Sequence, residues 1–335
     1  MKVLFLTRLY WPHVGGVEKH VYEIGKRLKV KGKSVTIITE KYDKHLNDEE
    51  IKDGIKIIRI DYPKIKYLGI FYIWFWLLKN ITLIKESDIV HVHDVFIWYW
   101  PFKILLPRKK VFLTFHGRWG VYPIPFTDIL QKRIGARFSN GLICIGDYIP
   151  KSYGIRSDTI AYGATYIPKN IPKKDKKSII YVGRLDKDIA LKKYFSVIKK
   201  LKGYKIEFCG QGELASEASL YGEVKGFVDP KPYMQKAKYC FASGYLTILE
   251  ALANKCLVFK TYDNALQKKY FELTPFSKFI ITSNNPRKLY DKFKYYEKNS
   301  KVANKLIEKG YNWVKWQTWE KLAQDYLNLW AQRRQ

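Results

Sequence analysis

The chain has 335 residues, which is enough for two α/β domains with well-developed cores and too many to favour a single core. It carries 61 Lys and Arg against 31 Asp and Glu, so its formal net charge is +30. That charge suits phosphate-bearing small molecules, anionic lipid or nucleic acid as partners, although a Lys-rich proteome would also explain it. The basic residues are spread out without a zinc-finger, RNP-type or basic-zipper pattern, so no nucleic-acid partner is expected.

Strand-like and helical patterns alternate over roughly the first 165 residues, which predicts a parallel sheet wrapped by helices. The first strand, 1–7, is a short apolar run, and a helix with apolar residues at helical spacing follows near 17–29. Further strands are expected at 34–39, 56–60, 88–94, 111–115 and 141–146.

Gly15 and Gly16 form a turn between the first strand and the first helix. Such a turn lets the backbone approach a ligand at the positive end of the helix. It is equally compatible with a tight turn that binds nothing, so it indicates a binding site only together with a partner site elsewhere.

The segment Lys64 to Lys85 is unusually aromatic, with Tyr67, Phe71, Tyr72, Trp74, Phe75 and Trp76 among Leu and Ile. Its apolar stretch of about a dozen residues is shorter than the roughly 20 that a membrane-spanning helix needs. Aromatic rings beside lysines suit a helix or loop in the headgroup region of an anionic membrane. The alternative is a helix buried between the sheet and a neighbouring element.

A Lys- and Pro-rich stretch at 168–177 has the composition of a linker, and the alternation restarts after it. Strands are expected at 178–184, 205–210, 223–228, 239–243, 256–261 and 278–282, with helices near 190–201 and from about 246. This pattern predicts a second βα domain.

The turns of the second half carry candidate phosphate-binding groups. Arg184 follows a strand, at the carboxyl edge where ligands of open α/β folds bind, and its guanidinium donates two parallel hydrogen bonds to phosphate. Gly210 and Gly212 form a turn that permits close backbone approach. Ser243 and Gly244 lead into a helix whose free N–H groups suit a diphosphate.

Glu250 lies in the first or second turn of that helix. A carboxylate there can accept hydrogen bonds from both hydroxyls of a ribose. The alternative is that its charge complements the helix dipole.

Four motifs in this order carry a family resemblance: Gly15-Gly16-Val17-Glu18-x-His20, Thr114-Phe115-His116-Gly117, Gly183-Arg184-Leu185 and Glu250-Ala-Leu-Ala. Over nearly its whole length the chain resembles a retaining glycosyltransferase of the GT-B fold, similar to glycosyltransferase family 4 (group 1). The resemblance implies two Rossmann-like domains facing a central cleft. Residues 1–167 would bind the acceptor, 168–312 would bind the nucleotide sugar, and 313–335 would cross back onto the first domain. Within the aromatic helical stretch 311–330, Trp313, Trp316 and Trp319 would act as packing anchors and a hinge brace.

The resemblance also assigns roles to residues. His116 would contact the transferring sugar, Arg184 would neutralise the leaving diphosphate and Glu250 would hold the ribose. The implied donor-binding set is Gly15, Gly16, Arg184, Lys187, Gly210, Gly212, Ser243, Gly244, Tyr245, Leu246 and Glu250. Stabilising the leaving diphosphate needs cations, helix N-termini or a metal.

Three positions depart from the family pattern. Ala242 stands where a first Glu is common, Ile189 where a Lys usually follows the Arg, and Ala190 where a Gly is expected. Lys187 or Lys192 would then have to reach the diphosphate. The departures fit either a diverged active subgroup or an inactive domain.

No Asp-x-Asp motif stands out as a metal site, and no cofactor or essential metal is expected. His91 and His93 should share one face of a strand, but no third ligand is evident near them, and Asp94 could instead face the cleft. The four cysteines have no CxxC spacing and mostly lie in apolar runs, which is typical of buried thiols in a reducing compartment. Without a leader-like N-terminus, the chain is expected to be cytoplasmic, on the inner face of the membrane.

These observations favour an enzyme that transfers a hexose-type sugar from a UDP- or GDP-linked donor to a lipid-linked or polysaccharide acceptor in cell-envelope glycan synthesis. One alternative is a catalytically silent GT-B protein that binds a partner or glycan in an envelope-assembly complex. Another is a GT-B-like nucleotide-sugar epimerase, which would need no acceptor.

Overall fold

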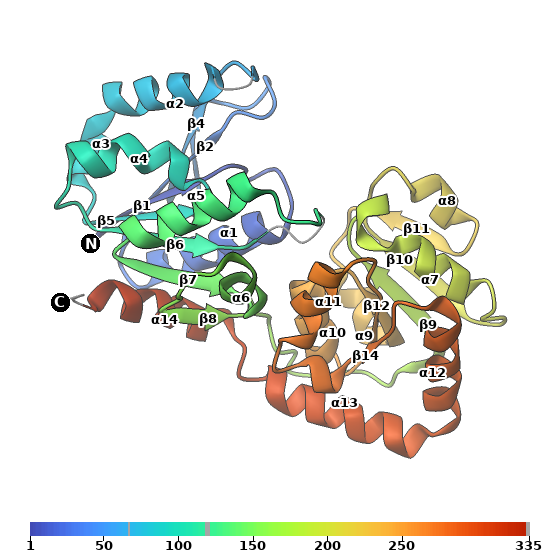
Figure 1. The fold of residues 1–335 in the computed structure, drawn as a ribbon. Coiled ribbons are helices and arrows are strands. Elements are labelled where there is room, and N and C mark those ends of the chain that lie inside the picture. Colours follow the sequence, from blue (N-terminus) through green and yellow to red (C-terminus); the bar gives the residue numbers. More distant parts are fainter. Residues whose placement is uncertain (66–67, 118–120, 333–335) are drawn as a thin grey trace. The chain divides into compact units, whose positions relative to one another are not determined.

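The computed structural model describes residues 1–65, 68–117 and 121–332, which divide into two compact α/β units (Figure 1). The first unit contains the described residues from Met1 to Gly117, Pro123–Ala161 and the described residues from Trp319 onward. The second unit contains Tyr162–Thr318 together with Val121 and Tyr122. The chain therefore returns to its first unit after completing the second.

The first unit is built on an eight-stranded sheet with the order β3-β4-β2-β1-β5-β6-β7-β8. Its strands are β1 (Lys2–Thr7), β2 (Ser34–Glu40), β3 (Glu49–Lys52), β4 (Ile55–Ile60), β5 (Ile89–His93), β6 (Val111–Phe115), β7 (Gly141–Ile145) and β8 (Thr159–Ala161). Neighbouring strands are parallel except for β3, which pairs antiparallel with β4 at one edge. Strands β5, β6 and β7 are buried along their whole length, as expected for strands with both faces covered.

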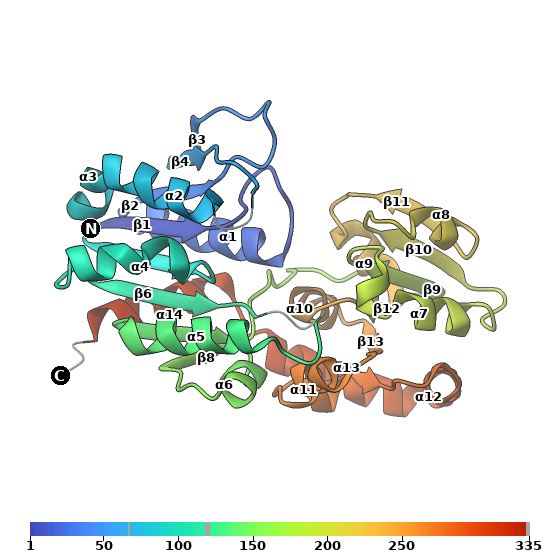
Figure 2. The same ribbon diagram turned by 45° about the horizontal axis from the view of Figure 1, so that its top comes forward.

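Helices cover both faces of this sheet (Figures 1 and 2). They are α1 (Gly16–Val30), α2 (Leu68–Lys79), α3 (Ile81–Glu86), α4 (Phe96–Leu105), α5 (Phe126–Phe138), α6 (Tyr148–Tyr153) and α14 (Trp319–Ala331). Helix α4 contacts both α2 and α5, whereas α14 packs against α1. Because parallel crossovers are right-handed, the reversal of strand order at β1 places α1 on the face opposite to α4 and α5.

The second unit has a six-stranded, wholly parallel sheet with the order β11-β10-β9-β12-β13-β14. Its strands are β9 (Asp175–Val182), β10 (Lys205–Cys209), β11 (Glu223–Gly226), β12 (Ala237–Ala242), β13 (Leu257–Lys260) and β14 (Ile281–Thr282). Its helices are η1 (Lys187–Ile189), α7 (Leu191–Ile198), α8 (Ala215–Ser219), α9 (Lys231–Lys236), α10 (Tyr245–Ala253), α11 (Ala265–Glu272), η2 (Ser277–Phe279), α12 (Pro286–Lys298) and α13 (Ser300–Val314).

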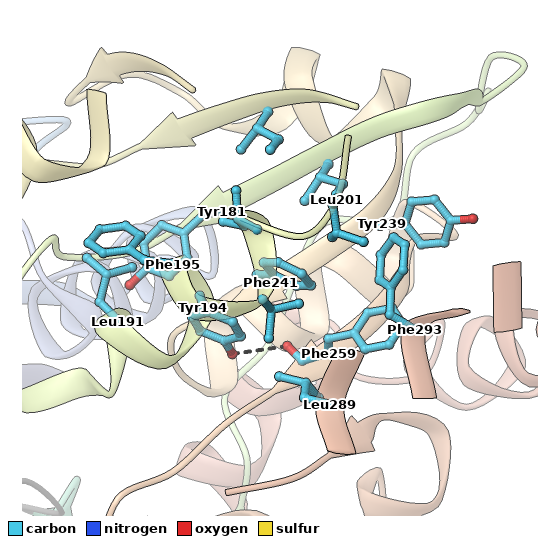
Figure 3. Close-up of a cluster of buried hydrophobic side chains, with 14 of the residues drawn as sticks. Tyr181, Leu191, Tyr194, Phe195, Leu201, Tyr239, Phe241, Phe259, Leu289 and Phe293 are labelled. Atoms are coloured by element: carbon cyan, nitrogen blue, oxygen red, sulfur yellow. Dashed lines mark hydrogen bonds between the residues drawn. The ribbon is translucent and has the colours of Figure 1, made fainter. Parts of the chain in front are cut away.

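An aromatic cluster fills the core between this sheet and helices α7 and α12 (Figure 3). Tyr194 stacks on Phe241 with ring centroids 4.8 Å apart, and Phe293 lies 4.5 Å from Tyr239. The buried Tyr194 hydroxyl has two carbonyl acceptors, at Ala242 3.0 Å away and at Phe259 3.2 Å away, and Figure 3 draws the bond to Phe259. The cluster therefore holds the ends of β12 and β13, from which the loops of the candidate site emerge.

The structure confirms the predicted α/β class and most of the predicted elements. Several details differ from the expectations. The edge strands β3 and β8 were not expected, the strand expected at 278–282 is reduced to β14, and β9 begins inside the stretch assigned to the linker. The helical stretch expected at 311–330 is two helices, because the chain breaks between α13 and α14. The change from the first unit to the second falls at Ala161, and the return falls at Thr318, where 167 and 312 were expected.

The tryptophans expected to anchor the C-terminal stretch behave differently from one another. Trp319 is fully buried, and Trp313 packs on Phe276 with ring centroids 5.5 Å apart. Trp316 is 68% exposed, so the prediction that it is a packing anchor was wrong. Trp330 is buried instead, at the end of α14.

Candidate functional site

Four histidines gather at the carboxyl edge of the first sheet, on the face covered by α1 and α14. His91 and His93 point to the same side of β5, as expected, with ring centroids 5.1 Å apart. His116 follows β6 and stacks on His93, and His20 of α1 meets His116 edge-on at 4.7 Å. The fold thus brings together histidines from three distant parts of the sequence: His20, the pair His91 and His93, and His116.

This cluster is tied to α14 by a chain of buried hydrogen bonds. The Trp330 indole donates to His91 Nδ1 over 3.0 Å, and His91 Nε2 lies 2.8 Å from the Thr114 hydroxyl. That hydroxyl lies 2.7 Å from the Tyr326 hydroxyl, which is 2.8 Å from His20 Nε2. The return of the chain to its first unit therefore completes the surroundings of the histidines.

The loop after β5 holds His116 in place. The Asp94 carboxylate accepts the backbone N–H of His116 over 3.2 Å and lies 3.0 Å from Lys132 Nζ. Burial disfavours the charged carboxylate, but the contributions of Lys132 and His116 together outweigh it, so the pKa of Asp94 is lowered. Asp94 is therefore an anchor for the loop that carries His116.

The clustered histidines are neutral at physiological pH. Burial lowers the pKa of His116 to about 4, although Asp94 acts in the opposite direction. Burial, together with neighbouring imidazoles, holds the pKa values of His20, His91 and His93 well below the usual value for histidine. Among the residues that the structure describes, no group of three or more His, Cys, Asp or Glu is arranged to hold a metal ion.

The glycine turn before α1 already faces a carboxylate. Glu18 folds back toward Gly15, where an added Cβ would lie 2.4 Å from its Oε2 atom, and it contacts His13 over 2.9 Å. Burial raises the pKa of Glu18, while its own backbone N–H and His13 oppose the rise. Because a carboxylate at this helix end would repel phosphate, the turn suits a neutral sugar better than a diphosphate.

At the carboxyl edge of the second sheet, three predicted turns lie against one another. An added Cβ at Gly210 would lie 1.8 Å from the Gly183 carbonyl, and one at Gly183 would lie 2.1 Å from the Ser243 hydroxyl. At Gly212 it would meet Asp186 Oδ1 at 2.2 Å. These glycines are therefore required by loop-to-loop packing, and the packing gathers Arg184, Lys187 and Ser243 at the point where strand order reverses.

The two predicted cations are paired with acids. Arg184 is exposed and binds Asp186 over 2.6 Å and Asp188 over 2.9 Å. Lys187 contacts Glu213 over 3.0 Å. Asp186 and Asp188 have the Asp-x-Asp spacing that the sequence reading passed over, and their carboxylates face a guanidinium. A diphosphate at Arg184 would therefore compete with these carboxylates.

The turn before α10 is supported from below. Tyr245 is buried and stacks on Tyr270 at 3.8 Å, and its backbone N–H donates to the Tyr270 hydroxyl over 3.2 Å. Leu246 fills the space beside Gly163. The side chains of Tyr245 and Leu246 thus serve packing, while Ser243 and Gly244 form the turn itself.

Lys260 is a residue of this edge that the sequence reading missed. It ends β13, is 1% exposed, and donates from Nζ to the Ser243 carbonyl over 2.9 Å. Burial lowers its pKa to about 7, although Asp263 opposes the shift. A Lys inside the apolar run Cys256-Leu-Val-Phe-Lys260 was the available signal, because a lysine is almost never fully buried without a partner.

Glu250 is the sixth residue of α10 and is half-buried. Because it lies beyond the first turn of the helix, the alternative that it complements the helix dipole is wrong. Burial, followed by smaller contributions that include the Glu250 carboxylate, raises the pKa of the Cys240 thiol on β12. All four cysteines are buried and free, as the sequence predicted.

The three departures from the family pattern are built into the core. Ala242 and Ile189 are 0% and 2% exposed, and Ala190 is buried with a left-handed φ of 60°. An acidic side chain at 242 or an ammonium at 189 would thus need different packing. The fold gives these positions a structural role in this chain.

Parts of the chain resemble known glycosyltransferases in sequence. Residues 14–151 match the family model described as Glycosyltransferase Family 4. A 94-residue segment is 30% identical to the phosphatidylinositol N-acetylglucosaminyltransferase GPI3 subunit of Saccharomyces cerevisiae, covering 27% of this chain but only 21% of the yeast protein. An uncharacterized glycosyltransferase of Methanocaldococcus jannaschii is 23% identical, and the match covers 96% of this chain and 95% of that protein.

Solved structures resemble the chain over nearly its whole length. Sucrose-phosphate synthase from Thermosynechococcus elongatus superposes with a TM-score of 0.77 at 16% identity, covering 98% of each chain. The HepE protein of Anabaena, solved with UDP and glucose, gives 0.72 at 12% identity, covering 98% of this chain and 99% of its own. The chain thus has the fold of the GT-B glycosyltransferases, and the sequence of residues 14–151 matches the model of glycosyltransferase family 4.

Proposed function

We propose that this chain is a retaining glycosyltransferase that moves a sugar from a UDP- or GDP-linked donor to a lipid-linked or polysaccharide acceptor. The observation that carries the proposal is the convergence of Arg184, Lys187 and the Ser243-Gly244 turn at the switch point of a parallel sheet. A guanidinium, an ammonium and helix N–H groups are the groups that stabilise a leaving diphosphate. The UDP in the Anabaena structure supports a uridine donor.

The first unit supports the sugar end of the reaction. His116 is neutral and lies beside helix α1, which follows the glycine turn. The ring of His20, on that helix, contacts the ring of His116 edge-on. Neutral imidazoles can exchange hydrogen bonds with sugar hydroxyls without attracting phosphate. The division of labour proposed here gives the sugar to the first unit and the nucleoside diphosphate to the second, with no cofactor or essential metal.

Thermal unfolding in the presence of UDP, GDP and their sugar conjugates tests the donor site. A ligand that binds only the folded chain stabilises it by about 2.7 kcal/mol at one hundred times its Kd, so Tm should rise with one nucleotide. Arg184→Ala and Glu250→Ala should abolish the rise, and Lys301→Ala on α13 should keep it. Retention would then be read by NMR from the anomeric configuration of the product. No rise with any nucleotide would overturn the donor assignment.

We propose further that the enzyme acts while bound to an anionic membrane surface on the cytoplasmic side. Helix α2 buries Ile73 and Leu77 but exposes five large apolar residues of the aromatic segment: Leu68, Phe71, Tyr72, Phe75 and Leu78. Lys66 and Tyr67 of that segment lie outside the described residues. Such an exposed row argues against the alternative of a fully buried helix and supports contact with lipid.

Helix α4 also exposes large apolar residues, and basic residues line a recess at its end. Helix α4 packs beside α2 and exposes Trp100, Ile104 and Leu105. A recess of about 810 Å³ at the end of α4 is lined by the basic residues Lys85, Arg108, Lys109 and Lys110, together with the acidic residues Glu86 and Asp88. Among the described residues, no helix is long and apolar enough to cross a bilayer. Rings at the interface and cations at the headgroups suit peripheral binding.

Vesicle co-sedimentation tests the membrane surface separately from the donor site. The protein should pellet with phosphatidylglycerol vesicles and much less with phosphatidylcholine vesicles, and added salt should weaken the binding. Phe71→Ser with Phe75→Ser should release it, whereas Tyr295→Ser, at a similarly exposed ring of the second unit, should not. Equal binding by all three proteins would remove the membrane from the proposal.

A catalytically silent GT-B protein is the second candidate. It is favoured by Ala242 and Ile189, which put core side chains where the resemblance leads one to expect ligand-binding groups. Turnover of any nucleotide sugar would exclude it. Release of an altered sugar without acceptor would instead favour the epimerase alternative.

A further inference from the structure

The His93–His116 pair contains an asymmetry that decides where their protons lie. His93 Nδ1 and His116 Nε2 are 3.1 Å apart, so one of these nitrogens donates and the other accepts. The other nitrogen of His93, Nε2, is buried and has no hydrogen-bond partner among the described residues. If Nε2 carried the proton, a buried N–H donor would be left without an acceptor, which is the costlier of the two arrangements.

The favoured arrangement follows directly. His93 carries its proton on Nδ1 and donates it to His116 Nε2, which must then be the unprotonated nitrogen of His116. Because His116 is neutral, its own proton lies on Nδ1. His116 is partly exposed, and its Nδ1 has no hydrogen-bond partner in the part of the chain that the structure describes.

The neighbouring hydrogen-bond chain is directed in the same way. An indole N–H can only donate, so Trp330 makes His91 Nδ1 an acceptor and leaves the His91 proton on Nε2. His91 then donates to Thr114, Thr114 to Tyr326, and Tyr326 to His20 Nε2, which gives every hydroxyl proton an acceptor. The rings of His20, His91 and His93 around His116 are thus fixed by buried contacts, and His116 cannot turn to exchange its nitrogens without breaking the contact with His93.

We propose that His93 is a positioning residue that presets His116 as the Nδ1–H tautomer, so that a neutral N–H donor is presented to a ligand oxygen. The proton is placed by the fold before any ligand arrives, which spares its rearrangement during binding. That the ligand oxygen belongs to a sugar rests on the proposed function. The tautomer itself does not, because it follows from contacts within the first unit.

Long-range ¹H–¹⁵N NMR of the protein labelled at its imidazole nitrogens tests the proposal at pH 7.5. The two ring nitrogens of a neutral histidine give distinct protonated and unprotonated signals. His116, assigned by the signals lost in His116→Gln, should show a protonated Nδ1 and an unprotonated Nε2. His45, an exposed histidine outside the cluster, serves as the internal reference for an unrestrained ring.

His93→Phe supplies the matched perturbation, since it keeps an aromatic ring and removes the donor. In that variant the His116 signals should move toward the pattern of His45. A protonated Nε2 on His116 in the wild-type protein would overturn the proposal, as would unchanged His116 signals in a folded His93→Phe variant. If that variant fails to fold, the wild-type spectrum alone decides. Because the measurement needs no nucleotide sugar and no acceptor substrate, its failure is distinct from failure of the proposed transferase activity.

Discussion

The ligand-facing edges of the two sheets use opposite chemistry. In the first unit the groups are neutral imidazoles and hydroxyls, buried except for the partly exposed His116, and they already hydrogen-bond one another. In the second unit Arg184 and Lys187 are exposed and charged, and each is held by carboxylates. A buried polar network depends on every member having a partner, whereas exposed ion pairs are weak and exchange easily. The first edge is therefore a fixed template and the second is an exchangeable anion site.

Acid should produce the largest difference between the two units, because it should destabilise the first unit much more than the second. All six histidines of the sequence precede residue 117, so the second unit has none. An unfolded chain takes up protons near pH 6.5, but the clustered histidines do so only at much lower pH, because burial lowers their pKa values. The contribution of these histidines to the stability of the first unit is thus fully present above about pH 6.5. Below that pH it falls by about 1.4 kcal/mol per pH unit for each histidine that is still neutral in the folded state.

Hydrogen exchange read by mass spectrometry at pH 7.5 and 5.5 would measure this effect unit by unit, after correction for the intrinsic exchange rate. Peptides from β5 and α14 should lose protection at the lower pH, while peptides from β12 and α10 should keep it. Lys260 does not change the expected result for the second unit. Its pKa of about 7 lies below the usual value for lysine, so its contribution to stability falls as pH drops from about 10.5 to 7 and is constant below pH 7. Equal loss in both units would contradict the comparison.

Removing one hydroxyl from the buried network should cost less, but still clearly. Tyr326→Phe leaves Thr114 and His20 without their partner, and an unsatisfied buried group costs about 1–3 kcal/mol. Urea unfolding should therefore give a reduced free energy of unfolding with an unchanged slope. Tyr295→Phe, at a ring that is 52% exposed, is the control and should change stability by less than about 0.5 kcal/mol. Similar losses in both variants would mean that the network contributes nothing specific.

The sequence was sufficient to predict much of the fold because apolar runs report burial directly. Strand β7 is apolar throughout and β6 is apolar except for Thr114, and each is buried on both faces. The break between α13 and α14 was missed because aromatic residues continue at helical spacing across it, while only the return to the first unit interrupts the helix. The short strand β14 was overestimated for a similar reason, since an apolar run does not distinguish a strand from a 3-10 turn.

The site was predictable in its turns and less so in its side-chain pairing. Gly183, Gly210 and Gly212 were expected near a ligand, and the structure adds that they are needed for backbone packing. The contact of His93 with His116, and that of His20 with Tyr326, join residues 23 and 306 positions apart. Such pairings depend on strand order and on the return of α14, which no local pattern contains.

Lys260 offers a smaller and more selective perturbation of the second edge. Lys260→Met removes the hydrogen bond to the Ser243 carbonyl and keeps most of the side-chain volume. Stability at pH 7 should stay similar or rise, because burying an ammonium is costly. Binding of the nucleotide that raises Tm should weaken by about tenfold, or about 1.4 kcal/mol, because the turn before α10 loses its support. Calorimetric titration measures this, with the exposed Lys202→Met as the control; unchanged affinity would leave Lys260 a core residue only.

The smallest expected effect tests whether the carboxylates at Arg184 are exchangeable. Asp188→Asn removes one negative charge that faces the Arg184 guanidinium. Because the Arg184 side chain is 60% exposed, this ion pair is well screened, so nucleotide affinity should rise only two- to fivefold. Asp188 is the better choice, because Asp186 also accepts the Glu213 backbone N–H and shapes the turn. The gain should shrink as salt is raised from 50 to 300 mM. Weaker binding in Asp188→Asn would show the reverse role, that the carboxylate holds Arg184 in the orientation that diphosphate needs.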